Sequence, residues 1–274
     1  MDIKLEEFKE DVQEKKKFKW KKFFVFIMII IFLIFLFIIY CRFKSTSGVK
    51  VHEYKITDSM LPDSFHGVKV VQFSDVYFGN TVNIDYLNDI VSHINKLKPD
   101  IVVFTGDLLT REVDEETKNN IIESLSSINP IIGKYAIKGD SDIDSFDSIM
   151  KSSGFMNITG SSVEVFYKSN TPIVLRNIDT TTVLFNILLI HEPDSIDTFE
   201  NKSNLVLAGH SLNGQINLPF IKKFFLKNGS KKYYDVYYDI DGTPLYISSG
   251  IGTTDFKYRL FNKPSINLYR LTKY

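Results

Sequence analysis

One uncharged apolar run sets the first limit on how this chain folds. The segment "FFVFIMIIIFLIFLFIIYC", Phe23–Cys41, is about 19 residues without a charged side chain, which is long enough to cross a bilayer as one helix. A soluble helix of this composition would have no polar face to turn toward water. The run therefore predicts a transmembrane helix over residues 23–41.

The charges on the two sides of this run are unequal. The preceding stretch "EKKKFKWKK" holds six lysines, whereas Arg42 and Lys44 are the basic residues that directly follow the run. The positive-inside rule places the basic segment 1–22 in the cytoplasm and the rest of the chain outside. No cleavage motif of small residues follows, so the run is expected to be an uncleaved signal-anchor in the cell membrane. Residues 42–50 are the expected linker.

Composition excludes several kinds of site and partner. The formal net charge is zero, so no nucleic-acid partner is expected. The single cysteine rules out an intrachain disulfide and a cysteine-based zinc site. A basic cluster at Ile221–Tyr234 is interpreted as a solvated face, or as one near anionic lipid head groups. The membrane bilayer is thus the first predicted partner.

From Val49 onward the pattern is that of alternating strands and helices. Apolar runs predict strands that end in "VVQFSD", "IVVFTGD" and "KYAIKGD", with helices after each of them. The first helix is expected to stop before Pro99, and the third to run over about 144–151. The second half predicts more strands, with hairpins at Ser169-Asn170 and Asp241-Gly242. The pattern indicates an α/β fold.

Five polar residues fall at the carboxyl ends of predicted strands: Asp75, Asp107, Asp140, His191 and His210. Taken singly, an Asp at such a place is usually a turn former or a helix cap, and a lone His is usually structural. Ligands collect at this edge of α/β sheets, however, and five strands would bring five metal-type side chains together there. The joint pattern indicates a metal site.

These blocks resemble those of the calcineurin-like metallophosphoesterases, in particular the bacterial branch with one N-terminal membrane helix. The resemblance runs from about Val51 to the C-terminus and includes "KPDIVVFTGDLL", "GKYAIKGDSD", "ILLIHEPD" and "NLVLAGHSLNGQINLP". It implies a four-layer α/β/β/α sandwich, two sheets face to face with helices outside, over residues 51–274. That domain would follow one N-terminal transmembrane helix.

The metal ligands of the family lie in the sequence motifs D-x-H, GD, GNHD, H and GH-x-H, and this chain departs from these motifs at several positions. Tyr77 and Leu212 stand in place of two histidines, Ser141 replaces the histidine near the phosphate, and Asp140 replaces an asparagine. Because Ser141 stands where the family has its catalytic histidine, no catalytic residue is predicted.

Sorted by ion, the losses fall on one side of the implied centre. The first ion would need Asp75, Tyr77, Asp107 and Leu212, of which Leu cannot bind a metal. The second ion would take Asp107, Asp140, His191 and His210, all of which can bind. Asp75 would be a remnant of the lost site, and the nearby carboxylates of Asp142, Asp144 and Glu192 are the candidate substitutes. One divalent ion at most, Mn, Zn or Fe, is expected.

Two functional hypotheses follow from this sorting. In the first, the protein is a pseudo-phosphoesterase with a single metal site or none. In the second, it is an active metal-dependent hydrolase of phosphoesters that works with one ion or with substitute ligands. The ligand in either case is an unknown phosphoester or another component of the cell envelope.

Overall fold

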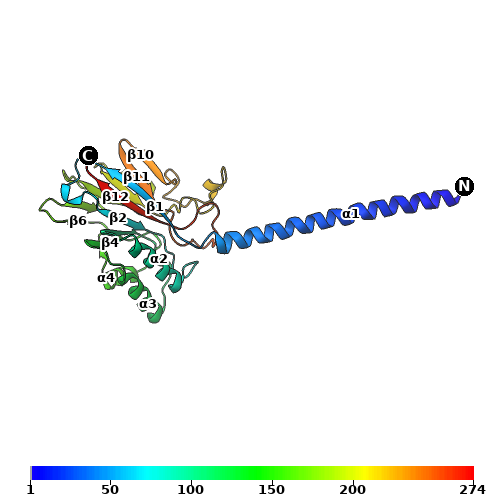
Figure 1. The fold of residues 1–274 in the computed structure, drawn as a ribbon, viewed down its shortest axis with the longest axis horizontal. Helices are drawn as coiled ribbons and strands as arrows, with labels where there is room; N and C mark the ends of the chain where they lie inside the picture. The colour runs from blue at the N-terminus through cyan, green and yellow to red at the C-terminus, as the bar shows by residue number, and fades with distance from the viewer. Residues whose placement is uncertain (1) are drawn as a thin grey trace. The chain divides into compact units, whose positions relative to one another are not determined.

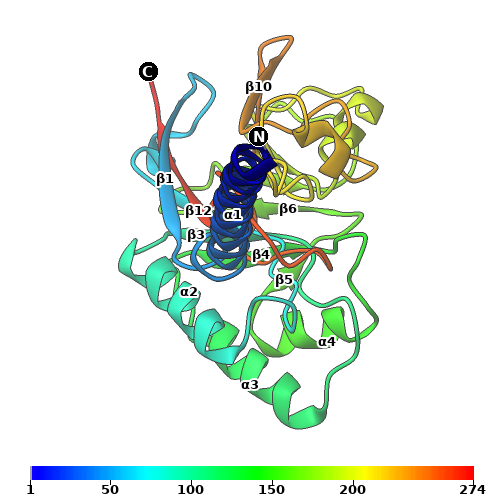
Figure 2. The same cartoon turned by 90° about the vertical axis from the view of Figure 1, so that its right-hand side faces the viewer.

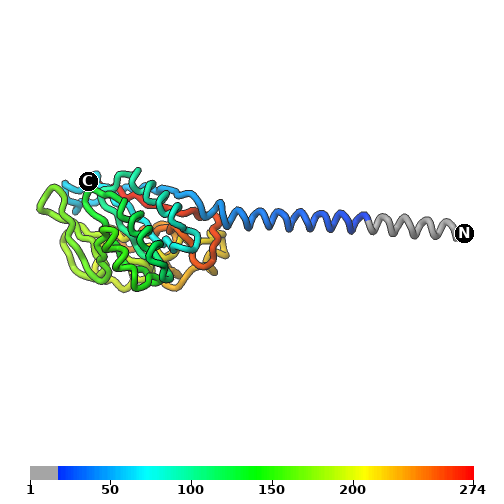
Figure 3. Tube along the Cα trace, turned by 90° about the horizontal axis from the view of Figure 1, so that it is seen from below, coloured from blue at the N-terminus to red at the C-terminus, as the bar shows by residue number. Residues whose placement is uncertain are grey.

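The computed structural model describes the backbone of residues 2–274 and the side chains from Phe18 onward. The side chains of residues 1–17, which make up most of the predicted basic segment, lie outside the described residues. The described chain forms two compact units, one up to Lys44 and one over Ser45–Tyr274. Figure 3 traces the chain from the N-terminal helix into the larger unit.

The N-terminal unit is one long helix. α1 spans Asp2–Ile39 and continues into a π-helical turn, η1, at Tyr40–Lys44. Phe18–Lys44 is long and apolar enough to cross a membrane, with a mean hydropathy of 3.4 in its most apolar 18-residue window, and contains the predicted span 23–41. The side chains of this stretch are unburied in its most apolar window, as expected of a helix whose partner is lipid.

The larger unit contains two six-stranded mixed sheets (Figure 1). The first has the order β1-β12-β2-β3-β4-β5, in which β12 runs antiparallel to β2 and the other neighbours are parallel. Its strands are β1 (Lys50–Thr57), β2 (Lys69–Phe73), β3 (Ile101–Thr105), β4 (Gly133–Ile137), β5 (Met156–Asn157) and β12 (Ser265–Thr272).

The second sheet has the order β10-β11-β9-β8-β7-β6, with parallel central strands and an antiparallel hairpin at each edge. Its strands are β6 (Ser162–Val165), β7 (Ile173–Arg176), β8 (Asn186–Leu189), β9 (Leu205–Ala208), β10 (Tyr237–Ile240) and β11 (Thr243–Ile247). Both predicted hairpins are confirmed. At the tip of the second, Asp241 and Gly242 have φ values of 52° and 85°, as a tight two-residue turn requires.

Three helices cover the outer face of the first sheet (Figure 2). They are α2 (Ile84–Lys96), α3 (Glu115–Ser126) and α4 (Ser145–Ser152), so the predicted third helix is displaced by one residue. The side chains of Asn83 and Asp114 cap the first turns of α2 and α3 by accepting a backbone N–H each. Apolar residues of the helices pack on Val71, Val102 and Phe104 of the sheet.

A second core lies between the two sheets. Val70, Ile101 and Val103 from the first sheet pack with Ile187 and Leu207 from the second. Strands buried on both faces need apolar side chains in succession, which is why the sequence shows continuous apolar runs instead of alternation.

The outer face of the second sheet has a different cover. A 3-10 helix, η3 (Pro193–Thr198), and the segment around Tyr233 pack there on Leu188, Val206 and Leu245. The predicted α/β fold with two facing sheets is confirmed, and the fourth layer is built from a 3-10 helix and irregular chain on this side.

We predict that Leu207→Ala lowers the free energy of unfolding by about 2–5 kcal/mol, because it leaves a cavity between the sheets. Chemical denaturation followed by circular dichroism measures the change. Val183→Ala, at a side chain that is 90% exposed, is the control and should change stability by less than about 0.5 kcal/mol. Equal stabilities for the two variants would contradict the described core.

Candidate metal centre

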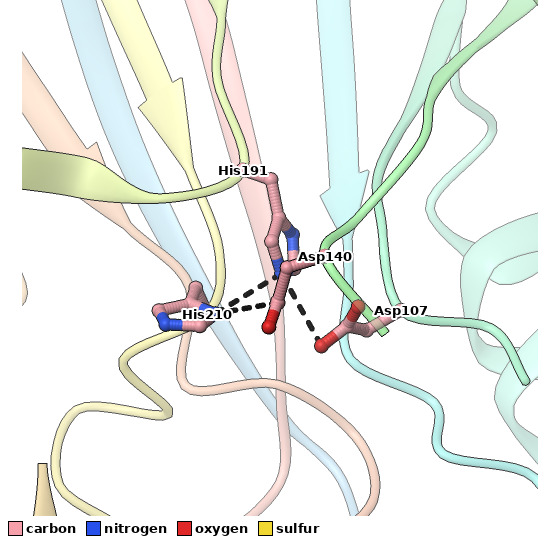
Figure 4. Close-up of side chains that lie close together, drawn as sticks. All are labelled: Asp107, Asp140, His191 and His210. Carbon is pink, nitrogen blue, oxygen red and sulfur yellow. Dashed lines mark hydrogen bonds and ion pairs between the residues drawn. The ribbon is translucent and has the colours of Figure 1, made fainter. Parts of the chain in front are cut away.

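Four side chains from four strand ends converge at one edge of the two sheets (Figure 4). Asp107 follows β3, Asp140 follows β4, His191 follows β8 and His210 follows β9. One ligand atom of each lies within 4.8 Å of the others. Both sheets thus contribute to one cluster, as the positions of these residues at the ends of apolar runs predict.

The contacts within the cluster are close. His191 Nε2 lies 3.0 Å from Asp140 Oδ1 and 3.2 Å from Asp107 Oδ2. His210 Nδ1 lies 2.9 Å from the same Asp140 oxygen. The cluster is buried except at Asp140, whose side chain is 40% exposed and is therefore the member that meets solvent.

Each histidine also contacts a backbone carbonyl with its second ring nitrogen. His191 Nδ1 lies 2.6 Å from the carbonyl oxygen of Thr105, and His210 Nε2 lies 2.6 Å from that of Asn228. A carbonyl accepts, so these nitrogens carry the protons of the neutral rings and the other two nitrogens present lone pairs. Such orienting contacts are typical of metal-binding histidines.

The two remaining nitrogens, His191 Nε2 and His210 Nδ1, are only 3.2 Å apart. Two lone pairs cannot face each other at this distance unless a proton or a metal ion lies between them. Together with two carboxylates they form an N₂O₂ set that suits Mn, Zn or Fe. The residues present therefore fit a single divalent ion.

The glycines before the ligands have a packing role. A Cβ on Gly106 would lie 2.5 Å from His191 Nδ1, and one on Gly139 would overlap the carboxylate of Asp107. A Cβ on Gly209 would approach Asp75 Oδ2 to 2.9 Å. The strand ends can meet at this spacing because these positions carry no side chain.

The backbone at three of the strand ends is left-handed. Asp75, Asp107 and His210 have φ values of 53°, 63° and 63°, a region that residues other than glycine seldom adopt. Such conformations cost on the order of 1–3 kcal/mol each and persist where surrounding structure enforces them. Their concentration at this edge makes the cluster a candidate functional site.

Asp142 joins the loops that follow β3 and β4. Its Oδ1 accepts the backbone N–H groups of Leu108 and Leu109, and its Oδ2 accepts those of Asp107 and Gly139. All four lone-pair sites of the carboxylate are thereby used. The expectation that Asp142 supplies an oxygen to a metal is wrong, because its charge positions Asp107 instead.

The other predicted substitutes do not join the cluster either. Asp144 is exposed, immediately before α4, and its side chain makes no capping hydrogen bond. Glu192 lies beside Gly229, where a Cβ would touch its carboxyl group. Ser141, in place of the family's histidine, donates its backbone N–H to Asp107 Oδ1.

Asp75, Tyr77 and Leu212, which the sequence assigns to the lost ion, lie beside the cluster and are held by hydrogen bonds or by burial. Asp75 is buried, and its carboxylate accepts the backbone N–H of His210 and the hydroxyl of Ser74. Tyr77 donates its phenol hydroxyl to Asp107 Oδ2, and Leu212 is buried. Burial, followed by the nearby carboxylates of Asp75 and Asp107, raises the pKa of Tyr77, so its phenol stays neutral.

Sequence reasoning missed Lys227, which belongs to the basic cluster interpreted as a solvated face. Its ammonium lies 2.9 Å from the Tyr77 hydroxyl, 3.6 Å from Asp107 Oδ2 and 3.7 Å from Asp140 Oδ1. Other lysines of that cluster do lie away from the centre: Lys222 pairs with Asp235 and Lys232 with Asp197. No sequence signal separates Lys227 from them.

Opposite charges set the ionisation of the cluster. Burial opposes the charged form of Asp107, but His191, Lys227 and Tyr77 outweigh it and lower the pKa of Asp107 to about 2. Burial likewise opposes the charged form of His191, and the carboxylates of Asp107 and Asp140 reverse this and raise its pKa well above 6.5. Without a metal, the neighbouring carboxylates thus favour the protonated form of His191.

A cavity of about 240 Å³ opens beside the cluster. His210 and Lys227 form part of its polar lining, and Leu212, Phe225 and Phe256 form part of its apolar lining. The two phenylalanine rings lie 5.6 Å apart. The cavity therefore offers an apolar wall next to the metal ligands.

The family model for calcineurin-like phosphoesterases matches residues 68–224, more than half of the chain. The chain belongs to the calcineurin-like phosphoesterase family. YkuE, an uncharacterized metallophosphoesterase of Bacillus subtilis, is 31% identical over 255 residues, which cover 85% of this chain and 88% of that protein.

Two further relatives carry descriptive names. A Danio rerio protein named transmembrane protein with metallophosphoesterase domain is 27% identical over 260 residues, which cover 83% of this chain and 58% of that protein. The UDP-2,3-diacylglucosamine pyrophosphatase LpxG of Chlamydia muridarum is 33% identical over 94 residues, which cover 33% of this chain and 28% of that protein. This chain thus spans less than two thirds of either protein.

We predict that metal binding releases about one proton at pH 7, because a metal ligand must be unprotonated and the metal-free His191 has a raised pKa. Affinity for Mn²⁺ should therefore rise as the pH is raised from 6 to 8. Titration calorimetry in buffers of different ionisation enthalpy counts the protons. Binding that is equally tight across this range and releases no proton would contradict the assignment.

We predict that Asp142→Asn lowers the free energy of unfolding by about 2–5 kcal/mol, because the amide Nδ2 would face two backbone N–H groups that it cannot accept. Thermal and chemical denaturation measure the loss. Asp144→Asn makes the same chemical change at an exposed carboxylate and should have little effect. A pair of variants with equal stability would argue against the bridging role.

Proposed function

We propose that this protein is a membrane-anchored, extracytoplasmic phosphoesterase-like protein that holds one divalent ion and binds phosphoesters without ordinary two-metal turnover. The family membership and the four-ligand cluster support the metal-dependent part of the proposal. The ligands are Asp107, Asp140, His191 and His210.

A single observation carries the proposal: the four metal-type side chains lie together, and the positions of the family's other two histidine ligands hold Tyr77 and Leu212. Tyr77 uses its hydroxyl to donate to Asp107, and Leu212 has no donor atom. Asp75, the remnant of the lost set, is bonded to His210 and Ser74. One complete ligand set therefore remains.

The chemistry that follows is that of one Lewis acid. A divalent ion in the remaining set would polarise a phosphoryl oxygen, whereas a pair of ions clamps the attacking and leaving oxygens together. Ser141 in place of the family's histidine removes a proton donor near the leaving group, and general acid–base catalysis is typically worth about 10²–10⁴-fold. Binding without efficient hydrolysis is the expected result.

The proposed location rests on the helix and on the charges around it. α1 includes a stretch that is able to span a membrane, and the Danio rerio relative is named as a transmembrane protein. The lysines before that stretch support a cytoplasmic N-terminus and an external domain over residues 51–274, with residues 42–50 as the linker. The site would then face ligands of the cell envelope.

The alternative is an active hydrolase that works with one ion. The cavity next to His210 favours it, because an apolar wall beside a metal centre suits a phosphoester with an apolar group. The relative named as a UDP-2,3-diacylglucosamine pyrophosphatase acts on such a molecule and matches a third of this chain. A measurement of phosphoester hydrolysis would distinguish the binding protein from the active hydrolase.

We predict that the purified full-length protein binds one ion per chain from Mn²⁺, Zn²⁺ or Fe²⁺ solutions and does not hydrolyse an aryl phosphodiester above background. His191→Ala and His210→Ala should lose the ion on dialysis, because each removes one ligand from the N₂O₂ set. Elemental analysis and a nitrophenol release assay are the measurements. Hydrolysis that disappears in both variants would establish the alternative instead.

A further inference from the structure

Lys227 is the one described lysine whose ammonium contacts the metal-ligand cluster. It comes from the segment after η4 (Lys222–Phe225), remote in sequence from the strands that carry the ligands. The ammonium lies 2.9 Å from the Tyr77 hydroxyl, 3.6 Å from Asp107 Oδ2 and 3.7 Å from Asp140 Oδ1, and 5.3 Å from the centre of the Tyr77 ring. Three acceptor oxygens thus surround a group with three N–H donors.

The same Asp107 oxygen, Oδ2, faces three groups. Oδ2 lies 3.2 Å from His191 Nε2, on the side of the ligand cluster, and 3.6 Å from the Lys227 ammonium. It also accepts the Tyr77 hydroxyl. An ion held by the cluster and the ammonium would therefore share one carboxylate, in the way that two ions share a bridging ligand.

We propose that the Lys227 ammonium takes the place of a second metal ion in this centre, limits the centre to one ion, and forms with that ion a pair of positive charges that binds a phosphate-type oxyanion. This inference rests on the proposed one-ion function and adds the identity of the second charge.

Charge and shape support the assignment. The surroundings hold four carboxylates, at Asp75, Asp107, Asp140 and Asp142, and a divalent ion alone leaves a negative balance there. An ammonium adds one charge without needing the coordination sphere that Leu212 has removed. Lys227 is partly exposed, and both it and His210 line the cavity, so a ligand entering there can meet both positive groups.

The proposal predicts which variants gain a second ion. In Tyr77→His/Leu212→His, two histidines return while Lys227 stays, and we expect one Mn²⁺ per chain. Adding Lys227→Ala removes the competing charge, and we expect two. Adding Lys223→Ala instead removes an exposed lysine of the same segment, and the count should stay at one.

Elemental analysis gives the count, and electron paramagnetic resonance gives an independent readout. A single Mn²⁺ shows a six-line spectrum, and two Mn²⁺ ions that share a carboxylate show a broadened, exchange-coupled one. Thermal unfolding of the full-length protein in detergent verifies that each variant is folded. Two coupled ions in the variant that retains Lys227, or one ion in the variant that lacks it, would overturn the inference.

The anion-binding part has its own test with inorganic phosphate as the probe. In the Mn²⁺-loaded protein, Lys227→Ala should weaken phosphate binding about tenfold, whereas Lys227→Arg and Lys223→Ala should retain most of it. Calorimetry measures the affinities. Equal phosphate affinity in Lys227→Ala and the unaltered protein would overturn this part. An unaltered protein that binds no metal would refute the proposed one-ion function instead. The ion count in Tyr77→His/Leu212→His with and without Lys227→Ala would then still test the role of Lys227.

Discussion

The Asp142 carboxylate holds the two loops that carry Asp107 and Asp140 at a fixed separation. It does so through four backbone N–H groups, which gives a buried negative charge the hydrogen bonds that it needs. Its hydrogen bonds include those from the left-handed backbone at Asp107 and from Gly139, a position where a Cβ would collide with Asp107. The position of the candidate metal ligands is thus set by a residue outside the cluster.

The second sheet supplies the histidines and the carbonyl contacts that orient them. Thr105, at the end of a first-sheet strand, accepts from His191 of the second sheet, so this contact also ties the two sheets together at the site. His210 is oriented by Asn228, next to Lys227 in the chain. The segment that brings in the extra positive charge therefore also fixes a ligand.

Much of this arrangement is predictable from the sequence, for identifiable reasons. Apolar runs that end in Gly-Asp or Gly-His mark strands buried on both faces, and the parallel order puts their ends at one edge. The hairpin at Asp241-Gly242 is encoded by local turn chemistry. Lys227 was not predictable, because its segment has no periodic pattern and its contacts with Tyr77 and Asp107 exist only in the folded chain. The role of Asp142 is not predictable from the sequence either, because the sequence does not show which backbone N–H groups a carboxylate accepts in the folded chain.

The close approach at Gly106, Gly139 and Gly209 divides this edge into two kinds of position. A methyl group at any of the three would collide with a candidate ligand or its neighbour, so these positions do not accept a residue larger than glycine. Tyr77, Leu212 and Lys227 come from loops beside these strand ends, where a change of side chain alters the groups that meet the centre. Divergence in metal number can therefore proceed by a few loop substitutions while the sandwich itself stays the same.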